Sequence, residues 1–269
     1  MNEIGKTEKL NSHVILNRGV IKNFVANSNE GKLFTLNLKS LEIEKKPAVE
    51  IGIVQNYFSK DVEEYFSGNY ETKLGRLIKL LNENRDYHFD ESDTKFIKAF
   101  FVVLLYRNPC IIDKIMSYAS NKYICNESNS SYIPGLLSRL KIDETFLDNF
   151  YVDVLFNDSS LGFISSTIGY GGLPNREKEN EIFFIPLTPK ISICLVNEKD
   201  FNDKTYIKKY AFTNDDIEQV KNINCFVAGI AKTTYKLYKH DEYDIYYLIG
   251  NNKDELERIK KIIENEIKR

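Results

Sequence analysis

The sequence contains no tryptophan and only three histidines and four cysteines in 269 residues. The cysteines lie far apart, at Cys110, Cys125, Cys194 and Cys225, with no CxxC pair and no tight Cys/His cluster. A structural zinc site needs ligands at short, paired spacings, so this distribution argues against one. We expect reduced, buried thiols instead.

Long hydrophobic runs are also missing. No apolar stretch reaches the roughly 18 residues that a membrane-spanning helix requires. The polar start, MNEIGKTEKLNS, lacks the apolar segment of a signal peptide. We therefore expect a cytoplasmic protein that does not enter the membrane.

An excess of charge of either sign is absent as well. The chain has 37 basic and 39 acidic residues, for a net charge of -2. Such a balance disfavours long nucleic acid as a partner, although a local basic patch is compatible with it. The 17 Tyr and 17 Phe residues, with many Asn, Lys and Ile, resemble the codon bias of an AT-rich genome, so we do not interpret them as an aromatic binding surface.

Apolar periodicity predicts helices in the first half of the chain. SHVILNRGVIKNF, from residue 12, predicts a short helix with Ser12 as its cap. A second helix is predicted over residues 61–84, and a third, very apolar one in DESDTKFIKAFFVVLLYRNP, with Asp90 or Ser92 as its cap and Pro109 at its end. Between them, GKLFTLNLKSLEIEKK alternates as a strand pair does, and AVEIGIVQNYF fits either a strand or a short helix.

Past residue 150 the pattern favours strands, in YVDVLF, LGFISSTIG, IFFIPL and KISICLV, with GYGGLPNREKENE as a surface loop among them. Thr213 and Asp216 have capping-box spacing before another helix, YDIYYLIG predicts a strand, and the chain ends in a charged helix. The predicted fold class is α+β, with a helical N-terminal half that holds a short strand pair and a mixed, β-rich C-terminal half. We expect one unit over residues 1–269, with a subdivision into 1–150 and 151–269 as the alternative.

Two charged residues fall on predicted apolar helix faces. Glu71 precedes Leu74 by three residues, and Arg107 follows Leu104 by three. Because an unpaired buried charge is costly, a Glu71–Arg107 ion pair explains both positions. The pair is either a brace between two core helices or part of a cleft, in which one residue orients a proton-transfer group and the other binds an anion.

Asn224 and His13 are the other polar candidates. Asn224 lies on the apolar face of the helix that begins near Thr213. It either bonds the backbone of a neighbouring element or contacts a ligand. His13, at the predicted start of a helix, is either structural or a general base or metal ligand with Glu71 as its carboxylate partner. GxGxxG, GxxxxGK[ST], HExxH and GxSxG do not occur.

Several short motifs follow one family pattern in order and spacing. They are His13, Val14, Leu16 and Phe24; NYF at 56–58; Glu71; YRNP at 106–109; GFISS at 162–166; IPLTPK at 185–190; and Asn224. Together they resemble the domain-of-unknown-function family 4238 over roughly residues 12–239. The chain departs from that pattern at Ile15, where the family tends to carry Pro, and at Thr167 and Gly169, where it tends to carry Asp-x-Pro. If that Asp is catalytic in relatives, this protein has lost the activity.

Two functions of different classes follow from these observations. The first is a bacterial effector or accessory enzyme of defence or mobile elements that hydrolyses nucleotides or short nucleic acid. His13 and Glu71 would perform acid–base or divalent-metal chemistry, while Arg107, Lys190 and Asn224 would bind the ligand. The alternative is a module without chemistry that binds a protein partner or a second copy of itself.

Overall fold

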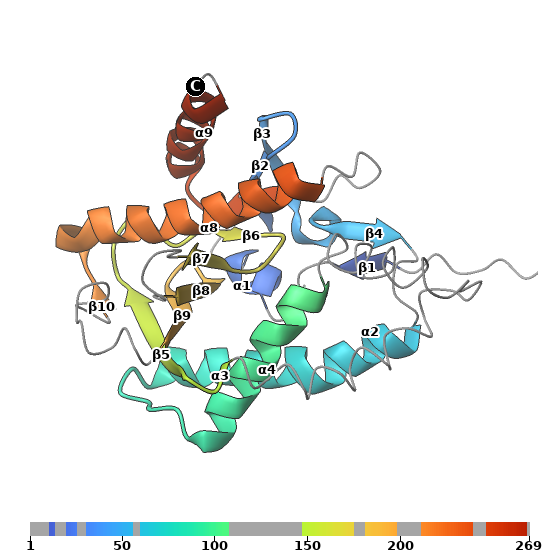
Figure 1. Cartoon of the computed structure of the whole chain (residues 1–269), viewed down its shortest axis with the longest axis vertical. Coiled ribbons are helices and arrows are strands. Elements are labelled where there is room, and N and C mark those ends of the chain that lie inside the picture. The colour runs from blue at the N-terminus through green and yellow to red at the C-terminus, as the bar shows by residue number, and fades with distance from the viewer. Residues whose placement is uncertain are drawn as a thin grey trace, which may run out of the picture.

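A computed structural model describes residues 11–13, 20–25, 31–55, 60–107, 147–174, 181–197, 211–238 and 246–267 (Figure 1). The helices in these ranges are α1 (Lys22–Val25), α2 (Lys60–Phe66), α3 (Thr72–Glu83), α4 (Glu91–Arg107), α8 (Ile217–Tyr238) and α9 (Lys253–Ile267). A π-helical turn, Ser67–Glu71, joins α2 to α3 without a break. In the described part of the chain, no helix combines the length and the apolar character needed to cross a membrane.

The strands of the described residues form three sheets. β1 (Asn11–His13) pairs with β4 (Ile53–Gln55). A five-stranded sheet has the order β10-β5-β9-β8-β7, with bounds Ala211–Phe212, Phe150–Asn157, Ile191–Asn197, Glu181–Thr188 and Gly171–Pro174. A four-stranded sheet has the order β3-β2-β11-β6, with bounds Ile43–Pro47, Lys32–Asn37, Tyr247–Gly250 and Ser165–Ser166. Pairing is antiparallel except between β10 and β5, so the described residues have an α+β fold.

Helices cover both faces of the five-stranded sheet. Successive side chains of a strand point to opposite faces, and two neighbouring phenylalanines of β8 show which helix lies on each. The Phe183 ring packs on Phe101 of α4, with 4.8 Å between centroids. The Phe184 ring stacks on Phe226 of α8 at 6.0 Å and 4°. Figure 1 accordingly shows α8 and α4 on opposite sides of these strands.

The four-stranded sheet joins segments from both sides of residue 150. β2 and β3 come before this position and β6 and β11 after it, and β11 lies between β2 and β6. α9 packs on this sheet, where Leu256, Ile259 and Ile263 are buried. Leu33, Thr35 and Leu36 of β2 are all fully buried although successive side chains point to opposite faces, so both faces of this strand are covered. Both α1 and α9 contact β2.

Most predicted elements are confirmed. The strand pair after Gly31 is β2–β3, the charged C-terminal helix is α9, and the helix over residues 61–84 is present with the π turn inside it. Asp90 caps α4, because its Oδ1 accepts the Asp93 backbone N–H at 2.8 Å. The capping box is also present, since Asp216 Oδ2 accepts the Thr213 backbone N–H at 2.8 Å. Pro109 lies outside the described residues.

Two local predictions are wrong. Ser12 does not cap a helix; it lies in β1 and pairs with Val54, because a partner strand outside the local sequence decides the conformation. The predicted surface loop GYGGLPNREKENE contains an edge strand of the five-stranded sheet, β7, in which Gly171 and Gly172 are buried. A Cβ atom on Gly171 would lie 2.5 Å from the Val227 Cα atom, so the glycine is there because β7 lies directly against α8.

Candidate functional site

A groove of about 740 Å³ lies between the α2–α3 helix and the N-terminal part of α4. Residue 148, which precedes β5, closes one side of it. The described residues that line the groove are Tyr65, Asn69, Tyr70, Lys73, Glu91, Ser92, Thr94, Lys95, Phe96, Lys98, Ala99 and Asp148. The set combines aromatic rings with lysines, a mixture that suits a ligand with one flat apolar part and one anionic part.

Three aromatic residues form a row along the groove. Tyr65 and Tyr70 have centroids 6.2 Å apart, with their planes tilted by 59°. Tyr70 stacks on Phe96 at 6.1 Å and 23°, and Phe96 stacks on Phe100 beneath it at 6.4 Å and 16°. Tyr65 is 40% exposed, so the row runs from the buried core of α4 out to solvent.

Three lysines surround this row. The Lys73 ammonium lies over the Phe96 ring, 5.8 Å from its centroid. Lys95 pairs with Glu91 at 2.7 Å, and both side chains are mostly exposed. Lys98 donates a hydrogen bond to the Asp148 carbonyl oxygen at 3.4 Å. The lining therefore carries three positive charges against the carboxylates of Glu91 and Asp148.

The π turn determines which residues of this helix share a face. Along an unbroken α-helix, positions 63 and 71 would be about 80° out of phase. A π turn closes with i to i+5 bonds and uses one more residue, so it reduces this angle. Thr72 marks the turn, since both its backbone N–H and its hydroxyl donate to the Ser67 carbonyl oxygen, the hydroxyl at 3.1 Å. Glu63 and Glu71 thereby come to the same side as Arg107.

Behind the groove, Arg107 is buried with 1% of its side chain exposed. Its guanidinium Nη2 lies 3.5 Å from Glu63 Oε2, and its Cζ lies 4.4 Å from the centroid of the Phe66 ring. Burial lowers the pKa of Arg107, while the charges of Glu63 and Glu71 raise it. The predicted partner, Glu71, is thus an electrostatic neighbour of Arg107, and Glu63, which the sequence analysis did not single out, forms the ion pair.

The buried charges and the groove share an aromatic wall. The ring under the Arg107 guanidinium, Phe66, packs edge-on against Tyr65 at 5.9 Å and tilted against Tyr70 at 6.3 Å. Arg107 therefore supports this aromatic wall from the protein interior, because its own side chain is almost entirely buried. Among the described lining residues, neither Glu71 nor Arg107 occurs.

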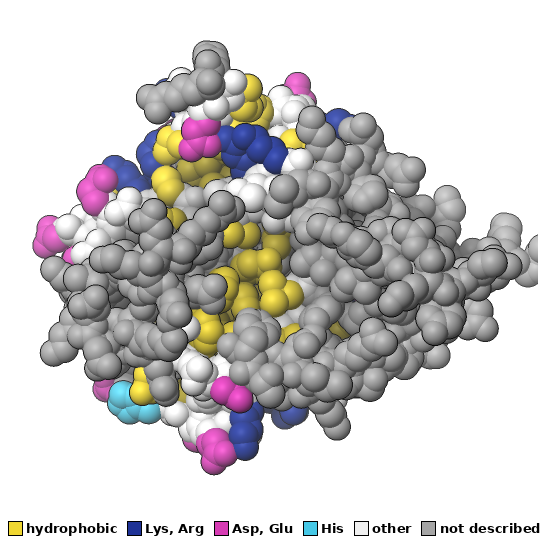
Figure 2. Space-filling view, in the orientation of Figure 1, with side chains coloured by type: hydrophobic (Ala, Val, Ile, Leu, Met, Phe, Trp, Pro, Cys, Tyr) yellow, Lys and Arg dark blue, Asp and Glu magenta, His cyan; other side chains and the backbone are white. Residues whose placement is uncertain are grey.

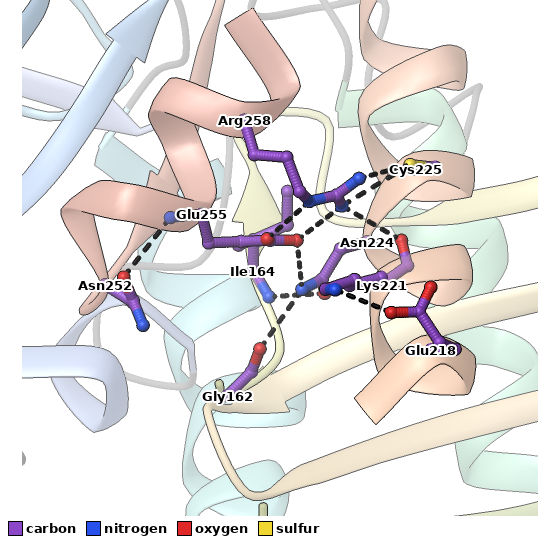
Figure 3. Close-up of polar contacts among 9 residues, drawn as sticks. All are labelled: Gly162, Ile164, Glu218, Lys221, Asn224, Cys225, Asn252, Glu255 and Arg258. Carbon is purple, nitrogen blue, oxygen red and sulfur yellow. Dashed lines mark hydrogen bonds and ion pairs between the residues drawn. The ribbon is translucent and has the colours of Figure 1, made fainter. Parts of the chain in front are cut away.

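Asn224 lies in a separate buried network that joins α8, α9 and the segment before β6 (Figure 3). Its Oδ1 accepts the Ile164 backbone N–H at 2.9 Å. Its Nδ2 donates to the Gly162 carbonyl oxygen at 3.1 Å and to Glu255 Oε1 at 3.0 Å. The side chain has no exposed surface, and both ends of its amide bind protein groups. These contacts match the structural interpretation of a mid-helix asparagine.

Glu255 extends this network to Arg258 and Cys225. Its carboxylate is 1% exposed and accepts two hydrogen bonds from Arg258, from Nε at 2.8 Å and Nη2 at 2.7 Å. These bonds raise the pKa of Arg258. The guanidinium also reaches the Lys221 carbonyl oxygen at 3.3 Å and Cys225 Sγ at 3.6 Å, as Figure 3 shows. Glu255 and Arg258 both belong to α9, so their pair holds the two side chains in position within that helix. The contacts that join α9 to α8 are those of Glu255 with Asn224 and of Arg258 with the Lys221 carbonyl oxygen and Cys225.

The remaining candidates lie elsewhere. His13 is in β1, opposite Ile53 of β4, so the prediction that it begins a helix is wrong for its backbone. Lys190 is exposed in the turn between β8 and β9. Hydrogen bonds from Arg85 lower the pKa of Asp158, and the charge of Lys190 adds to that effect. Neither lines the groove among the described residues. His88 is exposed as predicted, and His240 lies outside the described residues.

The lining residues of the groove were missed because tyrosine and lysine are common throughout this sequence. A signal was nevertheless present. Tyr65, Asn69 and Lys73 are spaced four residues apart on a helix whose apolar face is occupied by other residues, so a large aromatic ring lies on a polar face.

Within the described residues, no group of three or more His, Cys, Asp or Glu side chains is arranged to hold a metal ion. No protein-family model, curated protein or solved structure matches the chain. The resemblance to the domain-of-unknown-function family 4238 therefore stays a prediction, and function has to be argued from the groove itself.

Proposed function

We propose that this chain is a bacterial cytoplasmic effector or accessory enzyme, of the defence or mobile-element kind, that binds nucleotides or short nucleic acid in the groove and hydrolyses them. The observation that carries the proposal is the row of Tyr65, Tyr70 and Phe96 beside Lys73 and Lys98. A nucleotide has the same two parts, since its base stacks on aromatic rings and its phosphates attract ammonium groups.

The size of the groove supports this ligand class. Sites for small molecules and cofactors commonly measure about 300 to 1,000 Å³, and this groove has about 740 Å³. Each base that stacks on an aromatic side chain contributes about 1 to 3 kcal/mol. One stacked base with three exposed charge pairs of up to about 1 kcal/mol each supplies about 6 kcal/mol at most, which corresponds to a dissociation constant of tens of micromolar or weaker.

Charge distribution favours short ligands over long duplexes. A protein that binds along DNA presents a continuous basic stripe. On the face shown in Figure 2, Lys and Arg side chains of the described residues are interspersed with Asp and Glu. Together with the net charge of -2, this mixture supports a ligand that neutralises only a few lysines.

Hydrolysis is the proposed reaction, with Glu71 and His13 as the proposed acid–base groups. Glu71 is half-buried on the π turn, next in the chain to Tyr70, and its charge acts on Arg107. A divalent cation bound with the phosphates of the substrate is the proposed cofactor. Glu71 and His13 do not line the groove among the described residues, so turnover requires that the phosphates of the bound ligand reach them from the groove.

Binding is tested by calorimetry with ATP and with a short RNA of mixed sequence. Tyr65→Ala is expected to weaken binding about tenfold, since it removes the exposed stacking surface. Tyr151→Ala is the matched control, because Tyr151 is a similarly exposed tyrosine, at 47%, on β5 outside the groove. If neither ligand binds, or if both variants bind as the parent does, the groove is not a nucleotide site.

Turnover is tested by measuring product formation from the bound ligand with Mg²⁺ or Mn²⁺. We expect Glu71→Gln and His13→Ala to abolish turnover while leaving the dissociation constant within about twofold. Unchanged turnover in either variant removes that residue from the mechanism. If no ligand binds and the protein is an oligomer in solution, the alternative function, a protein-interaction or self-associating module, is favoured.

A further inference from the structure

We infer that the natural ligand of the groove is a single nucleotide with two or more linked phosphates, a nucleoside di- or triphosphate, rather than a strand of nucleic acid. This inference rests on the proposed function, whose ligand class it narrows. It follows from how much ring surface and how much positive charge the groove offers, and from where they lie.

Two of the three rings, Phe96 and Tyr70, pack against other side chains of the protein. Phe96 stacks on both Tyr70 and Phe100, at 23° and 16°, and the Lys73 ammonium lies above it. Tyr70 is half-buried and contacts the rings of Phe66 and Tyr65 in addition to Phe96. A base could reach only the edges of these two rings.

Tyr65 is the most exposed of the three rings in this row. It is 40% exposed, whereas Tyr70 and Phe96 are half-buried, so Tyr65 offers the largest ring surface to a ligand from solvent. A protein that tracks a single strand stacks successive bases on several exposed rings. One exposed ring in the row corresponds to one base.

The lysines are close together instead of spread along a path. Lys95 and Lys98 are three residues apart on α4 and so are neighbours on its surface. Lys73 faces the same groove from α3. Lys95 is held by Glu91, but that pair is mostly exposed, and such pairs open at little cost. Linked phosphates place several negative charges within this small area, whereas the backbone of a strand spaces them out.

The carboxylates in the lining act against a longer ligand. Glu91 and Asp148 belong to the same groove as the lysines. The phosphates of an extended strand would have to pass these negative groups, and like charges brought together lower affinity. A compact polyphosphate can contact the ammonium groups and remain on their side of the groove.

The experiment compares adenosine, AMP, ATP, inorganic triphosphate and an adenylate tetranucleotide by calorimetry on the full chain, without metal. We expect ATP to bind about tenfold more tightly than adenosine, with AMP between them, because each of two or three exposed charge pairs contributes up to about fivefold. The tetranucleotide should bind no more tightly than ATP, and inorganic triphosphate more weakly than ATP.

Two variants identify the contacts. Lys73→Ala should weaken ATP about fivefold and leave adenosine unchanged. Lys79→Ala is its matched control, since Lys79 is exposed on the same helix, pairs with Glu83 and does not line the groove. Tyr65→Ala should weaken adenosine and ATP alike, and Tyr65→Phe should retain both. Circular dichroism confirms that each variant is folded.

The failures are distinguishable. If the tetranucleotide binds more tightly than ATP, or if ATP gains nothing over adenosine, the inference is wrong and the proposed function stands. If inorganic triphosphate equals ATP, the base does not stack and the inference is also wrong. If none of the five probes binds, both the inference and the proposed function are overturned.

Discussion

The Arg107 guanidinium carbon lies 4.4 Å from the centroid of the Phe66 ring, and the same guanidinium pairs with Glu63 at 3.5 Å. The arginine comes from the end of α4, while both partners come from α2. One buried side chain therefore ties the C-terminal end of α4 to α2, the short helix whose Tyr65 lines the groove. The ring that it contacts supports Tyr65 and Tyr70 from behind.

Arg107→Leu is predicted to lower the free energy of unfolding by about 3 kcal/mol, because it leaves the charges of Glu63 and Glu71 without their buried cation. Denaturant titration measures the change. Arg76→Leu on α3, whose side chain is exposed, should change stability by less than about 0.5 kcal/mol. Equal effects of the two substitutions would show that the buried pair does not join the helices.

The Asn224 network predicts a difference between two small substitutions. Asn224→Ala should destabilise the protein by about 2 to 3 kcal/mol, since it leaves the Ile164 N–H and the Glu255 carboxylate short of a buried partner. Asn224→Asp should be worse near neutral pH, because it opposes two carboxylates at about the same place. Thr233→Ala, exposed on the same helix, is the control. If acid does not narrow the gap in melting temperature between Asn224→Asp and Asn224→Ala, the contact with Glu255 is wrong.

A surface pair predicts part of the acid dependence of stability. Arg85 donates two hydrogen bonds to Asp158, one at 2.7 Å, and these bonds lower the pKa of Asp158 below its usual 3.8. A carboxylate whose folded pKa is depressed stabilises the protein above its unfolded pKa, and this contribution is lost as the pH falls through the folded pKa. Both side chains are roughly half exposed, so the effect is small.

The expected result is that Arg85→Ala lowers the melting temperature at pH 6 and does so progressively less below about pH 4. Lys79→Ala, which removes an exposed lysine of the neighbouring helix, should not show this pH profile. A difference between Arg85→Ala and the parent that stays constant down to about pH 2 would exclude the Asp158 pair as its cause.

Two glycines are predicted to respond in opposite directions to alanine. Gly171→Ala places its Cβ 2.5 Å from the Val227 Cα atom, so β7 or α8 must move. The free energy of unfolding should fall by about 3 kcal/mol. Gly75→Ala has no atom within 4 Å of its Cβ and lies inside α3, so it should gain about 0.5 to 1 kcal/mol. Chemical denaturation of both variants decides; a destabilised Gly75→Ala would contradict the helix at that position.

Local sequence patterns were sufficient to predict an element wherever the contacts that define it lie within that element. The caps of α4 and α8, at Asp90 and Thr213, follow from hydrogen bonds that close within three residues. The apolar stripe of α4 predicts a helix and the alternation of β2 predicts a strand. Apolar residues recur with the period of the backbone, which is about 3.6 residues in a helix and 2 in a strand. The burial of Arg107 and of Asn224 was also predicted, since each falls on the apolar stripe of its own helix.

The sequence did not predict contacts between residues that lie far apart in the chain. Glu63 lies on the same side as Glu71, toward Arg107, because a π turn shifts the phase of the helix between them. Spacing rules for an α-helix do not include that shift. The strand at Ser12 depends on β4, and the strand at Gly171 depends on close contact with α8. The groove has the same origin, because Tyr65 and Lys73 from one helix meet Phe96 and Lys98 from another only when the core brings α2–α3 and α4 together. Within the described residues, the sequence by itself determined the helices α3, α4, α8 and α9, the β2–β3 strand pair and the burial of Arg107 and Asn224, since these depend on neighbours along the chain. Tertiary packing decided the strands at Ser12 and Gly171, the burial of Glu255 and which side chains meet, because those partners lie far away in the sequence.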